Sequence, residues 1–138
     1  MNYEVIRKER NENNIFAKFL GITITEIGPG YAKSELIINE NHININGVVH
    51  GGCIFTIADV TGGAASISDG NNYATLDSSF HYINPALNTS ALYAVTREIK
   101  RGKRICIQNV TVKNQDNLLI AEGTFTYMTI CNNKNQIT

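Results

Sequence analysis

Hydrophobic residues fall in short runs along the chain, and their spacing changes from helical to alternating. The segment NNIFAKFLG, residues 13–21, has the spacing of a short amphipathic helix and stops at Gly21. Beyond it, ITITEIG (22–28) and YAKSELIINE (31–40) alternate β-branched or apolar residues with polar ones around a Gly-Pro-Gly turn. This pattern predicts a short helix followed by a β-hairpin.

A longer apolar run begins at Gly51, after a loop over residues 41–50, and continues to about Ser66. It is apolar nearly all round and carries no turn signal, which favours a buried helix over a strand. The end of this run, Gly62-Gly63-Ala64-Ala65, consists of small residues. Small side chains there would permit the close approach of another backbone.

Four strand-like runs follow, at residues 73–84, 90–100, 104–114 and 118–130, with turn-forming residues between them. Strands joined by short turns predict an antiparallel meander. The whole order predicts an α+β fold, in which one buried helix faces a long curved antiparallel sheet. The edges of such a sheet need a partner, so we expect a dimer.

Composition narrows the class of protein. The 138 residues suit one domain over 1–138, and the equal totals of 12 basic and 12 acidic residues give no basic surplus for nucleic acid. Three widely spaced cysteines without a metal-ligand pair predict reduced thiols in a cytoplasmic protein. We expect neither a signal peptide nor a membrane span, because no apolar run approaches the ~18 residues that a span needs.

Candidate chemistry lies in NGVVHGGCIFTIADV, residues 46–60. Gly51 and Gly52 leave the amides of a helix N-terminus open to a carbonyl oxygen that becomes an oxyanion. The alternative is that they only let the loop turn tightly into the helix. Asp59 is a carboxylate among apolar neighbours, where burial should raise its pKa and suit it to act as general base or nucleophile. The alternative is that it caps a loop or hydrogen-bonds a nearby threonine.

Distance along the helix separates these two features. Gly51 and Asp59 are eight positions apart, and a rise of 1.5 Å per residue puts them about 12 Å from each other. One substrate carbonyl cannot touch both. Two such helices running antiparallel across a two-fold axis would bring Gly51 of one copy near Asp59 of the other, which predicts two composite sites per dimer.

Other candidate residues have less context. His50 could act as a base, but no Ser, Cys or acid partner at a suggestive spacing identifies it as a triad member, which favours a role in orienting the loop or contacting substrate. His42 and His81 show no partner pattern. Cys53 lies near the helix start, but its apolar surroundings indicate a packed core thiol.

The basic cluster of the sequence runs from Arg97 to Arg104. Its residues Lys100, Arg101, Lys103 and Arg104 could bind the phosphates of a ligand. The alternative is the solvated tip of a hairpin.

These residues resemble the motifs of hotdog-fold acyl-CoA thioesterases of the phenylacetic-acid-degradation (PaaI-like) family. The resemblance covers nearly the whole chain and rests on His42-x-Asn44-x-x-Gly47-x-x-His50-Gly51-Gly52, Phe55-x-x-Ala58-Asp59, Thr75-x-Asp77, Tyr82-x-x-Pro85-Ala86 and the Gly102 turn. It implies a hotdog fold with a long central helix. It also implies a homodimer or homotetramer with sites at the dimer interface.

The resemblance also implies roles for individual residues. The residue matching Asp59 acts as general base or nucleophile, and the amide matching Gly51 polarises the thioester carbonyl. The residue matching Asn44 positions water or substrate, that matching His50 supports the carbonyl region, and Thr75 stands where relatives carry a hydroxyl that assists the water. The sequence departs from the family pattern in its glycine-rich segment after Asp59.

The expected function is hydrolysis of acyl-CoA thioesters to a free acid and CoA, with CoA phosphates on the basic turn at Lys100, Arg101, Lys103 and Arg104. The resemblance implies no metal and no cofactor besides the CoA of the substrate. A non-catalytic acyl-CoA binding or regulatory module on the same fold is the alternative. A hotdog dehydratase would pair an acid with a histidine on separate motifs, which the sequence does not contain. Neither the acyl group nor the choice between CoA and an acyl carrier protein follows from the sequence.

Overall fold

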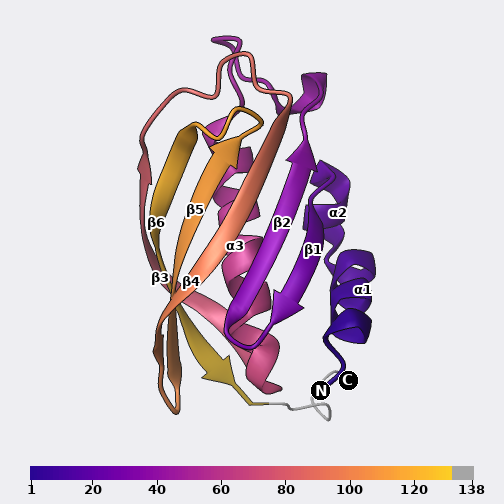
Figure 1. Cartoon of the computed structure of the whole chain (residues 1–138), viewed down its shortest axis with the longest axis vertical. Coiled ribbons are helices and arrows are strands. Elements are labelled where there is room, and N and C mark those ends of the chain that lie inside the picture. The colour runs from indigo at the N-terminus through magenta and orange to yellow at the C-terminus, as the bar shows by residue number, and fades with distance from the viewer. Residues whose placement is uncertain (132–138) are drawn as a thin grey trace.

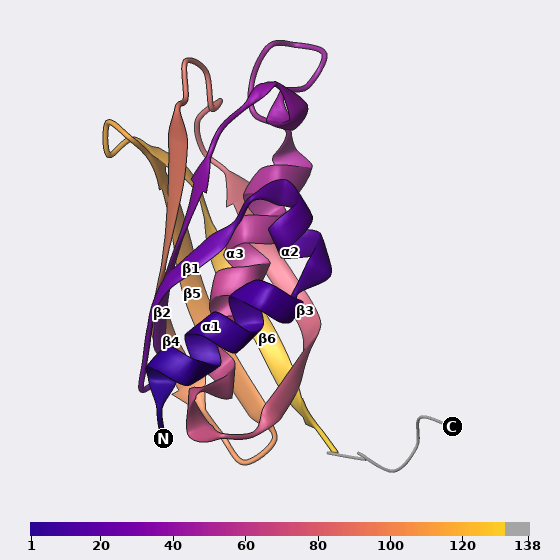
Figure 2. The ribbon, with the colours of Figure 1, turned by 90° about the vertical axis from the view of Figure 1, so that its right-hand side faces the viewer.

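The computed structural model describes residues 1–131, in which a curved six-stranded antiparallel sheet wraps one long helix (Figures 1 and 2). The predicted α+β architecture, with a central helix against a curved sheet, is confirmed. Its elements are α1 (Tyr3–Asn13), α2 (Ile15–Leu20), β1 (Thr23–Gly28), β2 (Tyr31–Ile37), η1 (Glu40–His42), α3 (Gly51–Ser66), η2 (Ile67–Asp69), β3 (Asn72–Tyr82), β4 (Ala91–Arg101), β5 (Ile105–Asn114) and β6 (Leu119–Ile130).

The strand order is β1-β2-β4-β5-β6-β3, which corrects the prediction that the last four strands form a simple meander. β4, β5 and β6 do follow one another, because tight turns join them. β3 instead pairs with β6 at the far edge, and β2 takes the place beside β4. The connection over residues 83–90 carries β3 away from β4, because it contains Pro85 and its backbone amides at Ile83 and Asn84 bond Ile120 on β6.

Burial of α3 holds the two layers together. The helix lies against the sheet as Figures 1 and 2 show, and both Ile57 and Ala58 are fully buried in the main core cluster. Each large apolar side chain buried here contributes about 1.5–3 kcal/mol relative to exposure. The sheet supplies Leu36, Leu92, Val110, Val112, Ile120 and Phe125 to the same cluster.

The first helix, α1, is an element that the sequence pattern did not predict. None of its residues is buried, so it lacks the apolar periodicity that marks a helix. Its role lies at the sheet edge, where the side chain of Asn11 accepts from the amide of Ile24 at 2.8 Å and donates to the Ile24 carbonyl at 2.9 Å. Asn11 thus satisfies the outer edge of β1 much as a neighbouring strand would.

The small residues near the end of α3 make room for the chain's own side chains. A Cβ at position 62 would lie 2.2 Å from the hydroxyl of Tyr127, and one at position 63 would lie 3.5 Å from Nη2 of Arg10. The expectation that these glycines admit another backbone is therefore corrected at Gly62, where the side chain of Tyr127 from β6 fills the space. At Gly63 the added Cβ would only contact Arg10 at an ordinary van der Waals distance.

Gly123 provides a test of the β3–β6 pairing. A Cβ at this position would lie 2.2 Å from the carbonyl oxygen of Ser79 and 2.7 Å from Cα of Phe80, so the two strands would have to separate. We expect Gly123→Ala to lower the free energy of unfolding by about 2–3 kcal/mol. The matched control is Gly28→Ala, whose Cβ would meet its nearest atom at 3.9 Å. Urea denaturation at one fixed protein concentration measures both variants, and equal stabilities would contradict the pairing.

Candidate functional site

α3 begins at a loop whose last residue, His50, caps the helix. His50 has φ −60° and ψ 134°, and its Nδ1 accepts a hydrogen bond from the amide of Gly52 at 2.8 Å. The amide of Gly51 has no acceptor among residues 1–131. It therefore stands open at the positive end of the helix dipole. The hydroxyl of Tyr82 donates to the carbonyl of Gly51 at 2.9 Å and fixes this end of α3 to β3.

The loop before His50 is shaped by Asn44. Its Oδ1 accepts from the amides of Asn46 at 2.9 Å and Val48 at 3.2 Å, while its own amide donates to the carbonyl of Val48. Its side-chain NH₂ makes no hydrogen bond within residues 1–131, so it can serve a ligand. Asn44 therefore builds the loop with its side chain, whereas Asn46 contributes a backbone amide.

The other two predicted histidines are separate from this chemistry. His42 is buried, its Nδ1 accepts from the amide of Asn39 at 3.0 Å, and its Nε2 lies 2.6 Å from the carbonyl of Leu20. Nδ1 thus helps to cap η1 within the loop, and Nε2 joins the loop to the end of α2, so both ring nitrogens have structural roles. His81 lies on β3, opposite Glu122 of β6.

The carboxylate of Asp59 lies in the middle of α3 and is held by two hydroxyl groups. Oγ1 of Thr75 donates to Oδ1 at 2.8 Å, and the hydroxyl of Tyr127 lies 3.2 Å from the same oxygen and 3.0 Å from the Asp59 carbonyl. Thr75 and Tyr127 are directly paired across β3 and β6. Oδ2 of Asp59 accepts no hydrogen bond from residues 1–131, which leaves it available to a water molecule.

Tyr127 is a site residue that sequence reasoning missed. Its side chain is only 2% exposed, and it reaches Asp59 because Gly62 has no side chain in the way. Burial first, and then the negative charge of Asp59, raise the pKa of Tyr127 well above its usual range. The phenol therefore keeps its proton and acts as a donor. The glycine pair after Asp59 was the available signal in the sequence, because glycines within a helix indicate that another group packs closely against it.

The five predicted catalytic residues and Tyr127 form two groups within one chain. We call Asp59, Thr75 and Tyr127 the Asp59 group, and Asn44, His50 and Gly51 the Gly51 group. Along α3 the two groups are about 12 Å apart, as the helical rise requires. β3 runs past both, because Thr75 bonds Asp59 and Tyr82 bonds Gly51. A single chain therefore does not bring Gly51 and Asp59 to one point.

The guanidinium of Arg101 in the basic turn makes its contacts within the protein itself. It donates to Glu98, to the hydroxyl of Tyr73 and to the carbonyls of Ser66 and Ala65 at the end of α3. It also lies 3.0 Å from the carboxylate of Asp69. The other predicted phosphate ligands, by contrast, are exposed at the tip between β4 and β5. These are Lys100, Lys103 and Arg104.

Other features of the described chain are quickly placed. Cys53 is buried in the core, and burial raises the pKa of its thiol, so the prediction of a packed core thiol is confirmed. Residues 1–131 contain no group of three or more His, Cys, Asp or Glu side chains arranged to hold a metal ion. No helix in this range is long and apolar enough to cross a membrane.

Comparison with known proteins places the chain in a family. The family model of the Thioesterase superfamily matches residues 46–121. Human acyl-coenzyme A thioesterase 13 is 29% identical over 127 residues, which are 89% of this chain and 90% of that protein. Acyl-coenzyme A thioesterase PaaI of Escherichia coli is 26% identical over 110 residues, covering 80% of this chain and 79% of that one.

Solved structures agree with the sequence matches. A Streptococcus mutans protein, smu.793, whose crystal structure is bound to acetyl CoA, superposes with a TM-score of 0.75 at 29% identity over 79% of this chain and 88% of that chain. The structure of PaaI from E. coli superposes with a TM-score of 0.85 at 23% identity over 90% of each chain, which supports the shared fold. The resemblance to PaaI-like thioesterases is confirmed. The chain belongs to the thioesterase superfamily, and its central helix wrapped by a curved antiparallel sheet is the hotdog fold.

Proposed function

We propose that the protein hydrolyses acyl-CoA thioesters to a free acid and CoA. The observation that carries this proposal is the carboxylate of Asp59, which Thr75 and Tyr127 hold through one oxygen while the other stays open. A carboxylate oriented in this way suits proton abstraction from a water molecule. The membership of the chain in the thioesterase superfamily and its likeness to acyl-coenzyme A thioesterases support the choice of substrate.

The reaction balances with water alone. Asp59 takes a proton from water as the water oxygen bonds to the thioester carbonyl carbon, and the carbonyl oxygen becomes an oxyanion. The Gly51 amide stabilises that oxyanion, with Asn44 and His50 beside it. The carbon–sulfur bond then breaks, and the CoA thiolate takes the proton back from Asp59. In the alternative route, Asp59 itself attacks the carbonyl carbon and water hydrolyses the resulting anhydride.

A complete site needs two copies of the chain. β3 is an edge strand with a partner on one side only within residues 1–131, and its Leu76 and Tyr82 side chains are more than half exposed. Antiparallel pairing with β3 of a second copy can set Thr75 opposite Tyr82 of the partner subunit. Because Thr75 bonds Asp59 and Tyr82 bonds Gly51, that register brings Asp59 beside Gly51 of the partner subunit. The proposed assembly is a homodimer that can pair again into a homotetramer.

The basic turn is proposed to bind the phosphates of CoA through Lys100, Lys103 and Arg104. Their exposed charges support this assignment, whereas the guanidinium of Arg101 serves the turn itself. The three free cysteines suit a reducing compartment, and the proposed location is the cytoplasm.

Asp59→Asn tests the central carboxylate. Asparagine can accept the same hydrogen bonds but cannot take a proton, so we expect kcat to fall about 10²- to 10⁴-fold with little change in melting temperature. The control is Asp77→Asn, which changes an exposed carboxylate on β3. The assay follows release of the CoA thiol over short, long and aryl acyl-CoAs. Full activity in Asp59→Asn would refute the mechanism, and ¹⁸O from labelled water in Asp59 after one turnover would identify a nucleophile rather than a base.

Gly51→Pro removes the proposed oxyanion donor without removing the helix start. Proline suits the first helical position, and His50 already has the extended conformation that a residue before proline prefers. We expect kcat to fall about 10²- to 10³-fold, while Gly51→Ala, which keeps the amide, retains most of its activity.

Mixing Gly51→Pro with Asp59→Asn tests the composite site. Random reassociation of equal amounts gives heterodimers in which one site carries both substitutions and the other carries neither. We expect about a quarter of wild-type activity to return from two inactive proteins. If mixing restores no activity although native mass spectrometry detects heterodimers, the site does not form between subunits.

Lys103→Met and Arg101→Met separate the two roles in the basic turn. Lys103→Met should raise KM for acyl-CoA several-fold and change the free energy of unfolding by less than about 0.5 kcal/mol. Arg101→Met should lower the free energy of unfolding by about 2–3 kcal/mol, because Glu98 and two helix carbonyls lose their donor. Steady-state kinetics and urea denaturation measure both. An unchanged KM in Lys103→Met would argue against phosphate binding at this tip.

A further inference from the structure

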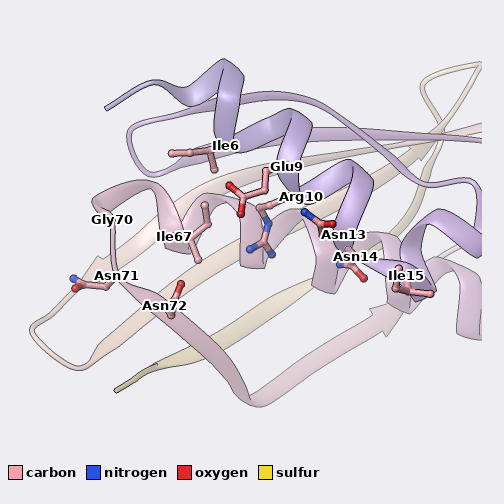
Figure 3. Close-up of a pocket in the computed structure, with 10 residues that line it drawn as sticks. All are labelled: Ile6, Glu9, Arg10, Asn13, Asn14, Ile15, Ile67, Gly70, Asn71 and Asn72. Carbon is pink, nitrogen blue, oxygen red and sulfur yellow. The ribbon is translucent and has the colours of Figure 1, made fainter. Parts of the chain in front are cut away.

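A pocket of about 580 Å³ lies between the first two helices and the turn that leads from η2 into β3 (Figure 3). Its lining combines polar side chains, including Arg10, Asn13 and Asn71, with the apolar Ile6 and Ile67. Figure 3 shows Arg10 extending from α1 into this space.

Arg10 differs from the other arginines that lie partly buried. Arg7 bonds Glu4, and Arg101 bonds Glu98, but no hydrogen bond or ion pair joins the guanidinium of Arg10 to any group in residues 1–131. Its Nε is buried and has no partner. Burial lowers the pKa of Arg10, although an arginine keeps its charge at neutral pH. A buried donor without a partner costs free energy, and the unpaired Nε together with the open Nη donors indicates a side chain positioned for a ligand.

The position of Arg10 relates the pocket to the catalytic carboxylate. Nη2 of Arg10 lies 3.5 Å from where a Cβ on Gly63 would stand. Gly63 follows Asp59 by four residues, so it is on the same face of α3 and about 6 Å further along the helix. A cation with open donors therefore lies about one helical turn from the carboxylate that is proposed to activate water.

The carboxylates near Arg10 attract its charge but form no hydrogen bond or ion pair with its guanidinium within residues 1–131. Glu9 also lines the pocket, but it is exposed and forms no ion pair with Arg10. Asp59 bonds Thr75 and Tyr127 instead. The donors of Arg10 are thus left for a ligand, and solvent screens the charge of Glu9.

We propose that this pocket receives the acyl group of the substrate and that Arg10 binds a carboxylate at its far end. The substrate class is the thioester of a short dicarboxylic acid, and this assignment rests on the proposed thioesterase function. A carboxylate matches the guanidinium in charge and in its two-pronged geometry. Asn13 offers a further amide donor, and Ile6 and Ile67 offer apolar surface for the methylene groups between the two carboxyl carbons. The side-chain NH₂ of Asn71 already donates one hydrogen bond to Asp69, at 3.2 Å.

Matched substrate pairs test the assignment. Glutaryl-CoA and pentanoyl-CoA have the same chain length and differ in the terminal carboxylate, as do adipoyl-CoA and hexanoyl-CoA. We expect the wild type to prefer the dicarboxylic member of each pair in kcat/KM. Arg10→Met should lower kcat/KM for that member about 10- to 100-fold and leave the other within about threefold. Lys8→Met, an exposed cation on the same helix, is the control and should change neither.

A binding readout accompanies the kinetics. Free glutarate should raise the melting temperature of the wild type and of Asp59→Asn, but not that of Arg10→Met. Without ligand, Arg10→Met should melt at the same temperature as wild type or higher, because it removes a buried donor that has no partner. A clear loss of stability would assign Arg10 a structural role instead.

The outcomes separate this proposal from the function on which it rests. Equal losses on both members of a pair in Arg10→Met would overturn carboxylate recognition, and so would a wild-type preference for the monocarboxylic member. Thioester hydrolysis could stand in either case. If the wild type hydrolyses no acyl-CoA, or if Asp59→Asn hydrolyses them fully, the thioesterase function itself fails.

Discussion

The burial of α3 against the curved sheet determines where every site residue lies. Because Ile57 and Ala58 are fully buried in the core, the next residue, Asp59, is held at the helix–sheet boundary, within reach of Thr75 and Tyr127. The same burial fixes Gly51 at the other end of α3, where Tyr82 anchors it. Loosening the helix from the sheet would therefore disturb both the carboxylate and the open amide.

The cost of removing polar groups from water explains the chemistry around Asp59. A hydroxyl as buried as that of Tyr127 needs an acceptor, and it finds two on Asp59. The buried Nε of Arg10 also needs an acceptor, and residues 1–131 provide none. The contact between Tyr127 and Asp59 is complete and orients a side chain, so it is structural. Arg10 lacks such a partner, which marks it as a position prepared for a ligand.

Sequence patterns predicted most of the fold because each major element has its own periodicity. The central helix was predicted with its observed bounds, Gly51–Ser66, and the hairpin turn at Pro29 was found. α1 was not predicted because it buries no residue. The position of β3 in the sheet was not predicted because a connecting segment, rather than strand periodicity, determines it. Asp59 stood out as a carboxylate in an apolar run. Tyr127 and Arg10 did not, since each reaches the site across a large separation in sequence that only the folded chain closes.

The two edge strands of the sheet, β1 and β3, differ in how open they are to pairing with a further strand. Asn11 occupies the backbone groups of Ile24 on β1, and α1 packs against the same strand, so both hinder the addition of a further strand there. The β3 edge remains available within residues 1–131, and pairing of two such edges around a two-fold axis consumes both. In the proposed homodimer, strand addition would stop at two copies, because the remaining outer edges would be the two β1 edges beside Asn11 and α1. A polar side chain on an otherwise unremarked helix would thus limit growth of that dimer into a fibre.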